Sequence, residues 1–296
     1  MNLQLPERLP VTVLVATKNE EANIKRCLTA LSPATKIIVV DSHSTDTTIK
    51  IAEDLGVEVV QFNYNGRYPK KRQWALDNVT IDTKWVLLLD ADEVVPEALW
   101  REISSATNTM SPNVAYLITK EFHFLGRPLR FGGFSHSAVL LFQKGKARFE
   151  HIVDGNSAGP DMEIHERLIV DGSIGRVGPA LIHEDFKGVE AYIARHNYYS
   201  TWEANVRLKF LSEGSWGHNS VEAKLAGNVQ ERRRFLKGIA AKVPFESWLW
   251  FFYHFYFRLG FLEGRRGLIA CQIRRNYIEQ VRAKIFEMQL RKENGT

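Results

Sequence analysis

The sequence predicts an α/β fold in which a mainly parallel sheet is followed by a C-terminal helical extension. Over the first ninety residues, short apolar runs alternate with helix-like segments, and strands joined through helices form parallel sheets with right-handed crossovers. The chain of 296 residues is 45% hydrophobic, which is enough for a large core. Its two cysteines, Cys27 and Cys271, lie far apart, so neither a disulfide framework nor a cysteine-rich zinc site is expected.

The first half is expected to contain four apolar strands separated by three helices. Buried strands are short continuous apolar runs, whereas helices place apolar residues three or four positions apart. Helices also start at cap residues and end at glycine or before proline. By these criteria the strands cover residues 11–16, 36–41, 57–60 and 85–89. The helices cover 21–31, 70–78 and a segment that follows the cap residues 44–46 and ends at Gly56.

Beyond Asp92 the pattern is less regular. Residues 97–106 are expected to form a helix and 115–124 a strand. Between Gly126 and Gly178, short strands separated by glycine turns indicate a mixed or antiparallel region. Helical character returns near Gly188 and continues to the C-terminus, with breaks at 214–217 and at Pro244.

The most informative stretch is the apolar run Val86–Leu89 followed by Asp90, Ala91 and Asp92. In an α/β domain the carboxyl end of a buried strand faces the ligand crevice. Two carboxylates at that place repel each other unless a cation lies between them. Oxygen ligands favour Mg²⁺ or Mn²⁺, and Mg²⁺ takes only one or two protein carboxylates beside water and substrate phosphate.

Polar residues also end two other strands, at Thr17–Glu20 and at Asp41–Asp46. Because the ends of parallel strands meet at one edge, a single crevice would collect them, and this layout can bind a nucleotide. Asp41 could accept a base N–H, the turn after the first strand could hold ribose, and the metal could take the diphosphate. Ser44 to Asp46 could equally be a plain helix cap.

The first half contains no glycine-rich phosphate loop of either common type. A metal and cationic side chains would therefore have to neutralise the phosphates. The cations Lys70, Lys71 and Arg72, at the start of their helix, are the candidates. The alternative interpretation is that they form a solvated helix face.

The segments Val15–Glu20, Val39–Asp46 and Leu89–Glu93 resemble the three signatures of family 2 glycosyltransferases in order and spacing. The chain is similar, more narrowly, to the bacterial branch that builds lipopolysaccharide cores and related surface glycans. That branch is matched by Phe62–Gln73, by the pair His165–Glu166 and by Gly260–Gly264. Two departures stand out. Glu263 replaces the usual aspartate, and His43 stands where glycine is common.

The resemblance implies a GT-A fold, a nucleotide-diphosphate sugar donor and an inverting mechanism. Asp41 would contact the base, with uracil expected, and Thr17 and Glu20 would lie near the nucleoside. Asp92 would hold Mn²⁺ or Mg²⁺ directly, while Asp90 would contact ribose or metal-bound water. The residues expected to bind the UDP-sugar are Thr17, Asn19, Glu20, Asp41, Ser44, Lys70, Arg72, Asp90 and Ala91.

Inversion by a single displacement needs a general base beside the acceptor hydroxyl. The resemblance favours Glu166, with Asp154, Asp161 and Glu184 as fallbacks. Strand alternation would separate Glu166 from His165, so the two are not expected to act as a touching pair. The alternative is a structural carboxylate paired with Arg167 or another base. His183 could be a second metal ligand, or a hydrogen-bonded structural histidine.

The C-terminal segment is basic and aromatic. Residues 229–296 hold 14 Lys and Arg against 6 Glu, a net charge of 14 − 6 = +8, while the whole chain carries +5. The run Arg232–Lys237 and the aromatic block Val243–Phe257 are typical of a helix that lies in an anionic membrane surface. No stretch is long and apolar enough to cross a bilayer. A buried helix packing on the catalytic domain or on a second subunit remains the alternative, and no nucleic acid is expected because the basic residues match no known module.

The sequence therefore predicts a glycosyltransferase that moves a hexose, with glucose slightly favoured, from a UDP-sugar to a lipid-linked or cell-surface glycan acceptor. It would be cytoplasmic and peripheral on the inner face of the cell membrane. Residues 1–225 would form the catalytic domain, with a nucleotide-sugar half at 1–110 and an acceptor-side half at 111–225, and residues 226–296 the membrane-associating extension. Two alternatives stay open, namely a nucleotidyltransferase and a non-catalytic membrane-binding protein. A homo-oligomer is a further outcome that the sequence leaves open.

Overall fold

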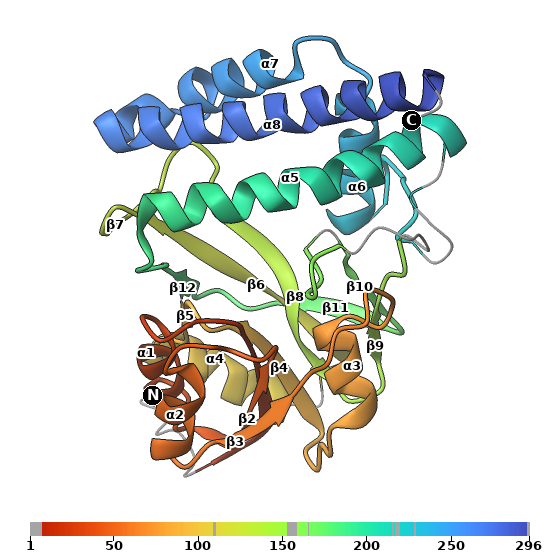
Figure 1. The fold of residues 1–296 in the computed structure, drawn as a ribbon. Coiled ribbons are helices and arrows are strands. Elements are labelled where there is room, and N and C mark those ends of the chain that lie inside the picture. Colours follow the sequence, from red (N-terminus) through yellow and green to blue (C-terminus); the bar gives the residue numbers. More distant parts are fainter. Residues whose placement is uncertain are drawn as a thin grey trace.

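The computed structural model describes residues 8–108, 111–152, 159–164, 166–214, 216, 220–227 and 229–294 (Figure 1). His165 and Asp154, both singled out from the sequence, lie outside these residues.

A mixed sheet of ten strands organises the molecule. Its order is β3-β2-β1-β4-β8-β6-β12-β5, with β7 and β11 also pairing with β6, and β9 and β10 form a separate two-stranded sheet. The strands β1 to β4 pair in parallel, as predicted, and β8 runs antiparallel between β4 and β6. The first six strands are β1 (Leu9–Thr17), β2 (Ala34–Asp41), β3 (Glu58–Gln61), β4 (Trp85–Asp90), β5 (Glu93–Val94) and β6 (Asn113–Phe124). The other six are β7 (Arg127–Pro128), β8 (His136–Gln143), β9 (Ala147–Phe149), β10 (Leu168–Val170), β11 (Ser173–Arg176) and β12 (Leu181–His183).

Helices cover both faces of the parallel strands. Alternate residues of β4 point to opposite faces, so Leu87 packs with α1 (Ile24–Thr29), α2 (Thr48–Asp54) and α4 (Glu97–Asn108), whereas Leu88 belongs to the cluster that includes α3 (Lys71–Asn78). Because both faces are buried, these strands are almost wholly apolar, and this explains why they could be recognised from the sequence.

The C-terminal helices form further layers beyond the sheet (Figure 1). Helix α5 (Gly188–Glu213) lies between the sheet and an outer layer of α7 (Glu246–Phe252) and α8 (Gly264–Glu293). Helix α6 (Val229–Ala240) packs beside α5, and a π-helical turn η1 (Tyr253–Phe257) and a 3₁₀ turn η2 (Gly260–Glu263) connect α7 to α8. The predicted α/β class with a C-terminal helical extension is confirmed.

Two helix starts differ from prediction. Helix α1 begins at Ile24 rather than at residue 21, because the Glu20 carbonyl first accepts the N–H groups of Asn23 and Ile24 in a turn. Helix α2 begins at Thr48, and its cap receives no hydrogen bond from Ser44. The interpretation of Ser44 to Asp46 as a plain cap is therefore wrong for Ser44, whose hydroxyl donates to Asp41. Asp46, in contrast, does accept the N–H of Thr48, the first residue of α2, at 3.0 Å.

Candidate active site

The acidic turn after β4 gives its two aspartates different surroundings. Asp90 ends β4, Ala91 is buried in the core, and Asp92 starts the crossing to β5. Asp92 is 8% exposed, and its Oδ1 atom is buried with no hydrogen-bond partner among the described residues. A buried oxygen of this kind is costly unless a ligand or ion completes it. Oδ1 of Asp92 is therefore available to a ligand.

Strand pairing places His183 beside Asp92. His183 is the register partner of Glu93 where β12 meets β5, and Glu184 N–H donates to the Asp92 carbonyl at 3.0 Å. As a result, His183 Nε2 lies 3.3 Å from Asp92 Oδ2. Burial disfavours the charged imidazole, but the Asp92 carboxylate outweighs it and raises the pKa of His183 to about 9. The two predicted metal ligands thus lie together.

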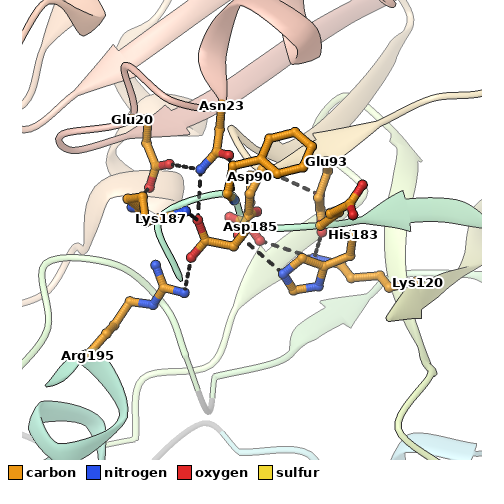
Figure 2. A network of polar contacts seen from close by, with 12 residues as sticks. Glu20, Asn23, Asp90, Glu93, Lys120, His183, Asp185, Lys187 and Arg195 are labelled. Carbon is orange, nitrogen blue, oxygen red and sulfur yellow. Dashed lines mark hydrogen bonds and ion pairs between the residues drawn. The ribbon is translucent and has the colours of Figure 1, made fainter. Parts of the chain in front are cut away.

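Asp90, in contrast, is paired with protein cations. Its Oδ1 accepts a hydrogen bond from Arg72, and Lys120 Nζ lies 3.2 Å from its Oδ2. Lys120 also lies 2.5 Å from Glu93, whose carboxylate accepts the Asp90 N–H (Figure 2). Although burial disfavours its charged form, Arg72 and Lys120 hold the pKa of Asp90 well below its usual range. The cluster of Arg72, Asp90, Lys120 and Glu93 is therefore internally neutralised.

On the other side of β4, the polar ends of β1 and β2 are bonded to each other. The Thr17 hydroxyl donates to Asp41 Oδ1 at 2.7 Å, and Ser44 donates to the same carboxylate through both its N–H and its hydroxyl. Asn19 Oδ1 accepts the Thr45 N–H at 2.8 Å. Asp41 is fully buried, and its hydrogen bonds order this turn. A direct contact of Asp41 with a nucleotide base stays a prediction.

The turn after β2 also explains the unusual His43. Its φ of 53° lies in the left-handed region, which glycine enters without penalty. The structure therefore shows the turn geometry that a glycine at this position would favour. Two contacts stabilise His43 in this conformation. Its N–H donates to Gln61, and its ring Nε2 lies 2.5 Å from Asn63 Oδ1.

A chain of polar contacts connects the β1 turn to α5 (Figure 2). Asn23 donates to both Glu20 and Asp185, and Arg195 donates to the same Asp185 at 2.6 Å. Lys187 lies 2.6 Å from the other oxygen of Glu20. Burial, followed by the Asp92 charge, raises the pKa of Glu20. Glu20, predicted to bind the nucleoside, therefore also connects the first loop to the beginning of α5.

Three consecutive cations at the start of α3 each contact a different acid. Lys70 Nζ lies 2.6 Å from Glu166, Lys71 Nζ lies 3.1 Å from Asp161, and Arg72 contacts Asp90. Lys70 and Lys71 are buried. The interpretation of these residues as a solvated helix face is therefore wrong, because each cation has an acidic partner and the two lysines are buried.

Glu163 caps the N-terminus of α3. Its carboxylate accepts the N–H groups of Arg72 and Gln73 at 3.1 and 3.0 Å. It thus acts as an N-terminal cap supplied by a segment about ninety residues further along the chain. The segment that carries Glu166 is in this way fixed to the start of α3.

Glu166 itself lies in an irregular segment before β10, outside the regular strand alternation used to predict its direction. Its Oε1 faces Lys70 and its Oε2 accepts the Ile164 N–H at 3.0 Å. The fallback acids are each paired, Asp161 with Lys71 and Glu184 with Arg26. Of the candidates described, Glu166 is the one held directly beside Lys70.

Helix α5 supplies groups that the sequence analysis missed. The Lys70 ammonium lies 4.1 Å from the centroid of the Trp202 ring, a cation–π contact. Arg195 donates to Asp185 and its charge reaches Asp92, helping to lower the pKa of that carboxyl. The signal was present, because Arg195 and Trp202 lie seven positions apart and so share one helix face.

Comparisons with known proteins identify the family of the chain. Residues 12–116 match the family model described as glycosyl transferase family 2. An uncharacterized glycosyltransferase of Rickettsia conorii is 31% identical over 215 residues, which cover 71% of this chain and 73% of that protein. The chain belongs to glycosyltransferase family 2. A lipopolysaccharide core biosynthesis glycosyltransferase, LpsC of Rhizobium meliloti, is 25% identical over 210 residues, 68% of this chain and 73% of LpsC.

Among solved structures, glucosyl-3-phosphoglycerate synthase from Mycobacterium tuberculosis, in complex with Mn²⁺, UDP and glucosyl-3-phosphoglycerate, is 21% identical. The similarity covers 38% of this chain and 44% of that one, with a TM-score of 0.30. Because the chain belongs to glycosyltransferase family 2, it is an enzyme. Membership of this family also decides against the nucleotidyltransferase and the non-catalytic protein that the sequence alone left open.

Two side chains of the glycosyltransferase are suited to ligate a divalent cation. Within the part of the chain that the structure describes, the buried Oδ1 of Asp92 lacks a hydrogen-bond partner, and the imidazole of His183 lies beside the same carboxylate. Among the described residues no group of three or more His, Cys, Asp or Glu could enclose an ion. Two protein ligands leave most of the shell to water and phosphate, which is the arrangement that Mg²⁺ tolerates. Asp92 and His183 therefore fit the expected metal.

Most cations of the basic run Arg232–Lys237 bind acceptors within the protein. Arg234 is buried and donates to Glu150, which is also fully buried. Arg233 donates to the Ser137 carbonyl at 2.7 Å, and Lys237 lies 3.2 Å from Glu203. The interpretation of residues 232–237 as lipid-facing cations is therefore wrong for these three, because protein acceptors bind them.

The aromatic block divides into a packed side and an exposed side. Trp250 stacks on His254 and contacts Phe134, whereas Phe252, Tyr256 and Phe257 are exposed. No helix in the described ranges has the length and apolarity needed to cross a membrane. Packing on the catalytic domain, one arm of the alternative considered for this block, therefore holds for Trp250 but not for the exposed side chains. Packing of those side chains on a second subunit stays a prediction that a single chain does not test.

Proposed function

We propose that this enzyme transfers a hexose, with inversion, from a UDP-sugar to a lipid-linked or cell-surface glycan acceptor with the help of Mn²⁺ or Mg²⁺. The observation that carries the proposal is the unpartnered Asp92 oxygen beside His183, at the sheet edge that also holds the Thr17–Asp41–Ser44 cluster. These are the positions at which the family signatures place the donor site.

The donor would lie along the ends of β1, β2 and β4. The ordered turn formed by Thr17, Asn19, Asp41 and Ser44 would hold the uridine, with Glu20 beside it. Asp92 and His183 would hold the metal, which as a Lewis acid would stabilise the departing diphosphate. Arg72 and Lys120 keep Asp90 in place, so Asp90 is suited to orient ribose or a water of the metal shell rather than to bind the ion itself.

Glu166 would act as the general base. It would take the proton of the acceptor hydroxyl while that oxygen bonds to the sugar C1 and the bond from C1 to the diphosphate oxygen breaks. A single displacement of this kind inverts the configuration at C1. The contacts with Lys70 and with the Ile164 N–H orient the carboxylate, and orientation is the condition for efficient proton transfer.

The chain organisation would follow the three segments expected from the sequence. Residues 1–110 would bind the nucleotide sugar, residues 111–225 would meet the acceptor, and residues 226–296 would place the enzyme on the inner face of the cell membrane. The similarity to LpsC, a protein named for lipopolysaccharide core biosynthesis, supports an acceptor of the cell envelope. Glucose is the donor sugar that we would test first.

A ligand-stabilisation experiment tests the donor and metal together. The melting temperature is measured with a panel of nucleotide sugars, each with and without Mn²⁺, for the native chain, Asp92→Asn and the surface control Asp171→Asn. A ligand at 100 times its Kd stabilises the native state by about 2.7 kcal/mol. We expect a metal-dependent shift with one UDP-sugar that persists in Asp171→Asn and disappears in Asp92→Asn. A shift of equal size in Asp92→Asn would contradict the metal assignment.

A further inference from the structure

The segment from Phe245 to Leu262 exposes an unusual amount of apolar surface. Ten large apolar side chains within these eighteen residues are exposed, with Phe257 at 78% and Phe245 at 74%. Soluble proteins rarely keep such a concentration open to water unless it meets a partner or a membrane. We call these residues the aromatic face: Phe245, Trp248, Leu249, Phe252, Tyr253, Tyr256, Phe257, Leu259, Phe261 and Leu262.

The face is a continuous ridge and not a set of scattered rings. Phe252 stacks between Trp248 and Tyr256, at centroid distances of 6.0 Å on both sides. Tyr253 stacks on Phe257 at 6.4 Å. These residues recur three or four positions apart, so they share one side of α7 and η1.

The opposite side of the same helix is firmly packed. Glu246 and Ser247 are buried, with Glu246 bonded to Arg207 at 2.7 Å and Ser247 donating to Glu279. The exposed rings are therefore displayed by a fixed helix, and their exposure does not result from a helix that has failed to dock.

The charges around the aromatic face have one predominant sign. Between residues 241 and 268 the cations are Lys242, Arg258, Arg265 and Arg266, and the acids are Glu246 and Glu263. Both acids are used inside the protein, since Glu246 binds Arg207 and Glu263 accepts the Phe131 N–H at 2.7 Å. A surface of aromatic rings rimmed by cations complements negative headgroups above an apolar layer.

A second copy of the chain is the less suitable occupant. A symmetric contact would bring the same cations of two copies together and desolvate them. Trp248, Tyr253 and Tyr256 also carry polar tips, which favour the boundary between headgroups and acyl chains. We propose that the aromatic face docks on an anionic lipid bilayer and lies in its surface.

The segment from His254 to Gly260 attaches the aromatic face to the loop before β8. His254 Nδ1 lies 2.6 Å from the Gly132 carbonyl, and Gly132 N–H donates to the Arg258 carbonyl at 2.8 Å. Gly260 is needed for this contact, because a Cβ there would lie 2.8 Å from the His254 carbonyl. The loop containing Gly132 leads directly into β8, whose first residue, His136, is the register partner of Lys120.

The docking surface is thus held at a fixed position relative to the strand that carries Lys120 into the crevice. A docked enzyme would present the crevice at a constant height above the bilayer, where a lipid-linked acceptor displays its sugar. The docking assigns a defined surface to the membrane placement that is part of the proposed function, and only this last step rests on the proposed transfer to such an acceptor.

The test is flotation of the full chain with phosphatidylglycerol vesicles or phosphatidylcholine vesicles, at low and high salt. The variants are Phe252→Ser with Phe257→Ser, and Lys242→Glu with Arg265→Glu, all at exposed positions. The matched control is Leu236→Ser, an exposed apolar residue on α6. We expect binding to anionic vesicles only, a loss of tenfold or more in both double variants, and native binding in the control.

Equal binding by the ring variants and the native chain would overturn the proposal, as would equal binding to the two vesicle types. Failure to bind vesicles, combined with concentration-dependent dimerisation that the ring variants abolish, would assign the face to a second copy instead. Because flotation needs no sugar donor, and the UDP-sugar melting shift needs no lipid, failure of the docking proposal and failure of the proposed function give different results.

Discussion

The ammonium of Lys70 lies 2.6 Å from the carboxylate of Glu166, and the two side chains are only 8% and 4% exposed. The pair joins the start of α3 to the irregular segment before β10. Removing one partner of a buried ion pair leaves the other uncompensated, which is strongly destabilising. Any test of Glu166 as a base must therefore separate catalysis from stability.

We expect Glu166→Gln to reduce the transfer rate by 10²- to 10⁴-fold, the usual contribution of a general base. The melting shift caused by UDP-sugar should remain. The double variant Lys70→Met with Glu166→Gln removes both charges, so it should recover most of the lost stability but none of the activity. Progress curves and urea unfolding of the native chain and the two variants provide the measurement. A double variant that regained transfer would show that Glu166 is structural.

Lys120 is expected to be essential for the stability of the β4–β5 turn. Lys120→Met removes the cation shared by Asp90 and Glu93, and Glu93 is fully buried. Breaking a buried pair costs roughly 3–5 kcal/mol. The control Lys146→Met breaks the exposed pair with Asp171 and should cost about 1 kcal/mol or less. Urea unfolding compares the two, and similar losses in both would argue against this account of the cluster.

Gly267 in α8 is expected to tolerate no side chain. A Cβ there would lie 2.1 Å from the Gly260 carbonyl, although alanine in a helix is normally favoured by about 1 kcal/mol. Gly178 has no atom within 4 Å of such a Cβ, so Gly178→Ala should change the free energy of unfolding by well under 1 kcal/mol. If Gly267→Ala proved as stable as Gly178→Ala, the close approach of η2 to α8 would be wrong.

His196 should make the stability depend on pH. Burial, with help from Arg274 and Arg195, lowers the pKa of His196 from 6.5 to about 4. Between these values the unfolded chain binds a proton that the folded chain does not, so stability is complete above pH 6.5 and falls as the pH drops toward 4. The loss is about 1.4 kcal/mol per pH unit. His196→Gln should flatten the urea-unfolding profile between pH 4.5 and 6.5, and an unchanged slope would exclude His196 as its source.

Much of the parallel half could be predicted because local patterns determine it. Buried strands such as 85–89 are continuous apolar runs, and their polar ends converge once the strands are parallel. For this reason the sequence predicts Asp92 and Asp41 on one edge. His183 is predicted as a metal ligand or as a hydrogen-bonded structural histidine, but its contact with Asp92 depends on the pairing of β12 with β5 and is not predicted.

The partners of charged residues could not be predicted in the same way. Lys120 lies about thirty residues from Asp90, and their contact depends on the sheet order, in which the antiparallel β8 pairs with both β4 and β6. Likewise, the basic run that includes Arg234 looks the same in sequence whether it faces lipid or Glu150. Charge patterns identify where ions gather, but burial, which depends on long-range packing, decides what they bind.

The cap that Glu163 provides for α3 has a consequence for synthesis. A helix of eight residues is too short to be stable alone, and α3 receives its terminal hydrogen bonds from a residue made ninety positions later. These hydrogen bonds at the start of α3 therefore cannot form until Glu163 has left the ribosome. The helix and the segment that caps it complete their structure together, even though the chain produces them in succession.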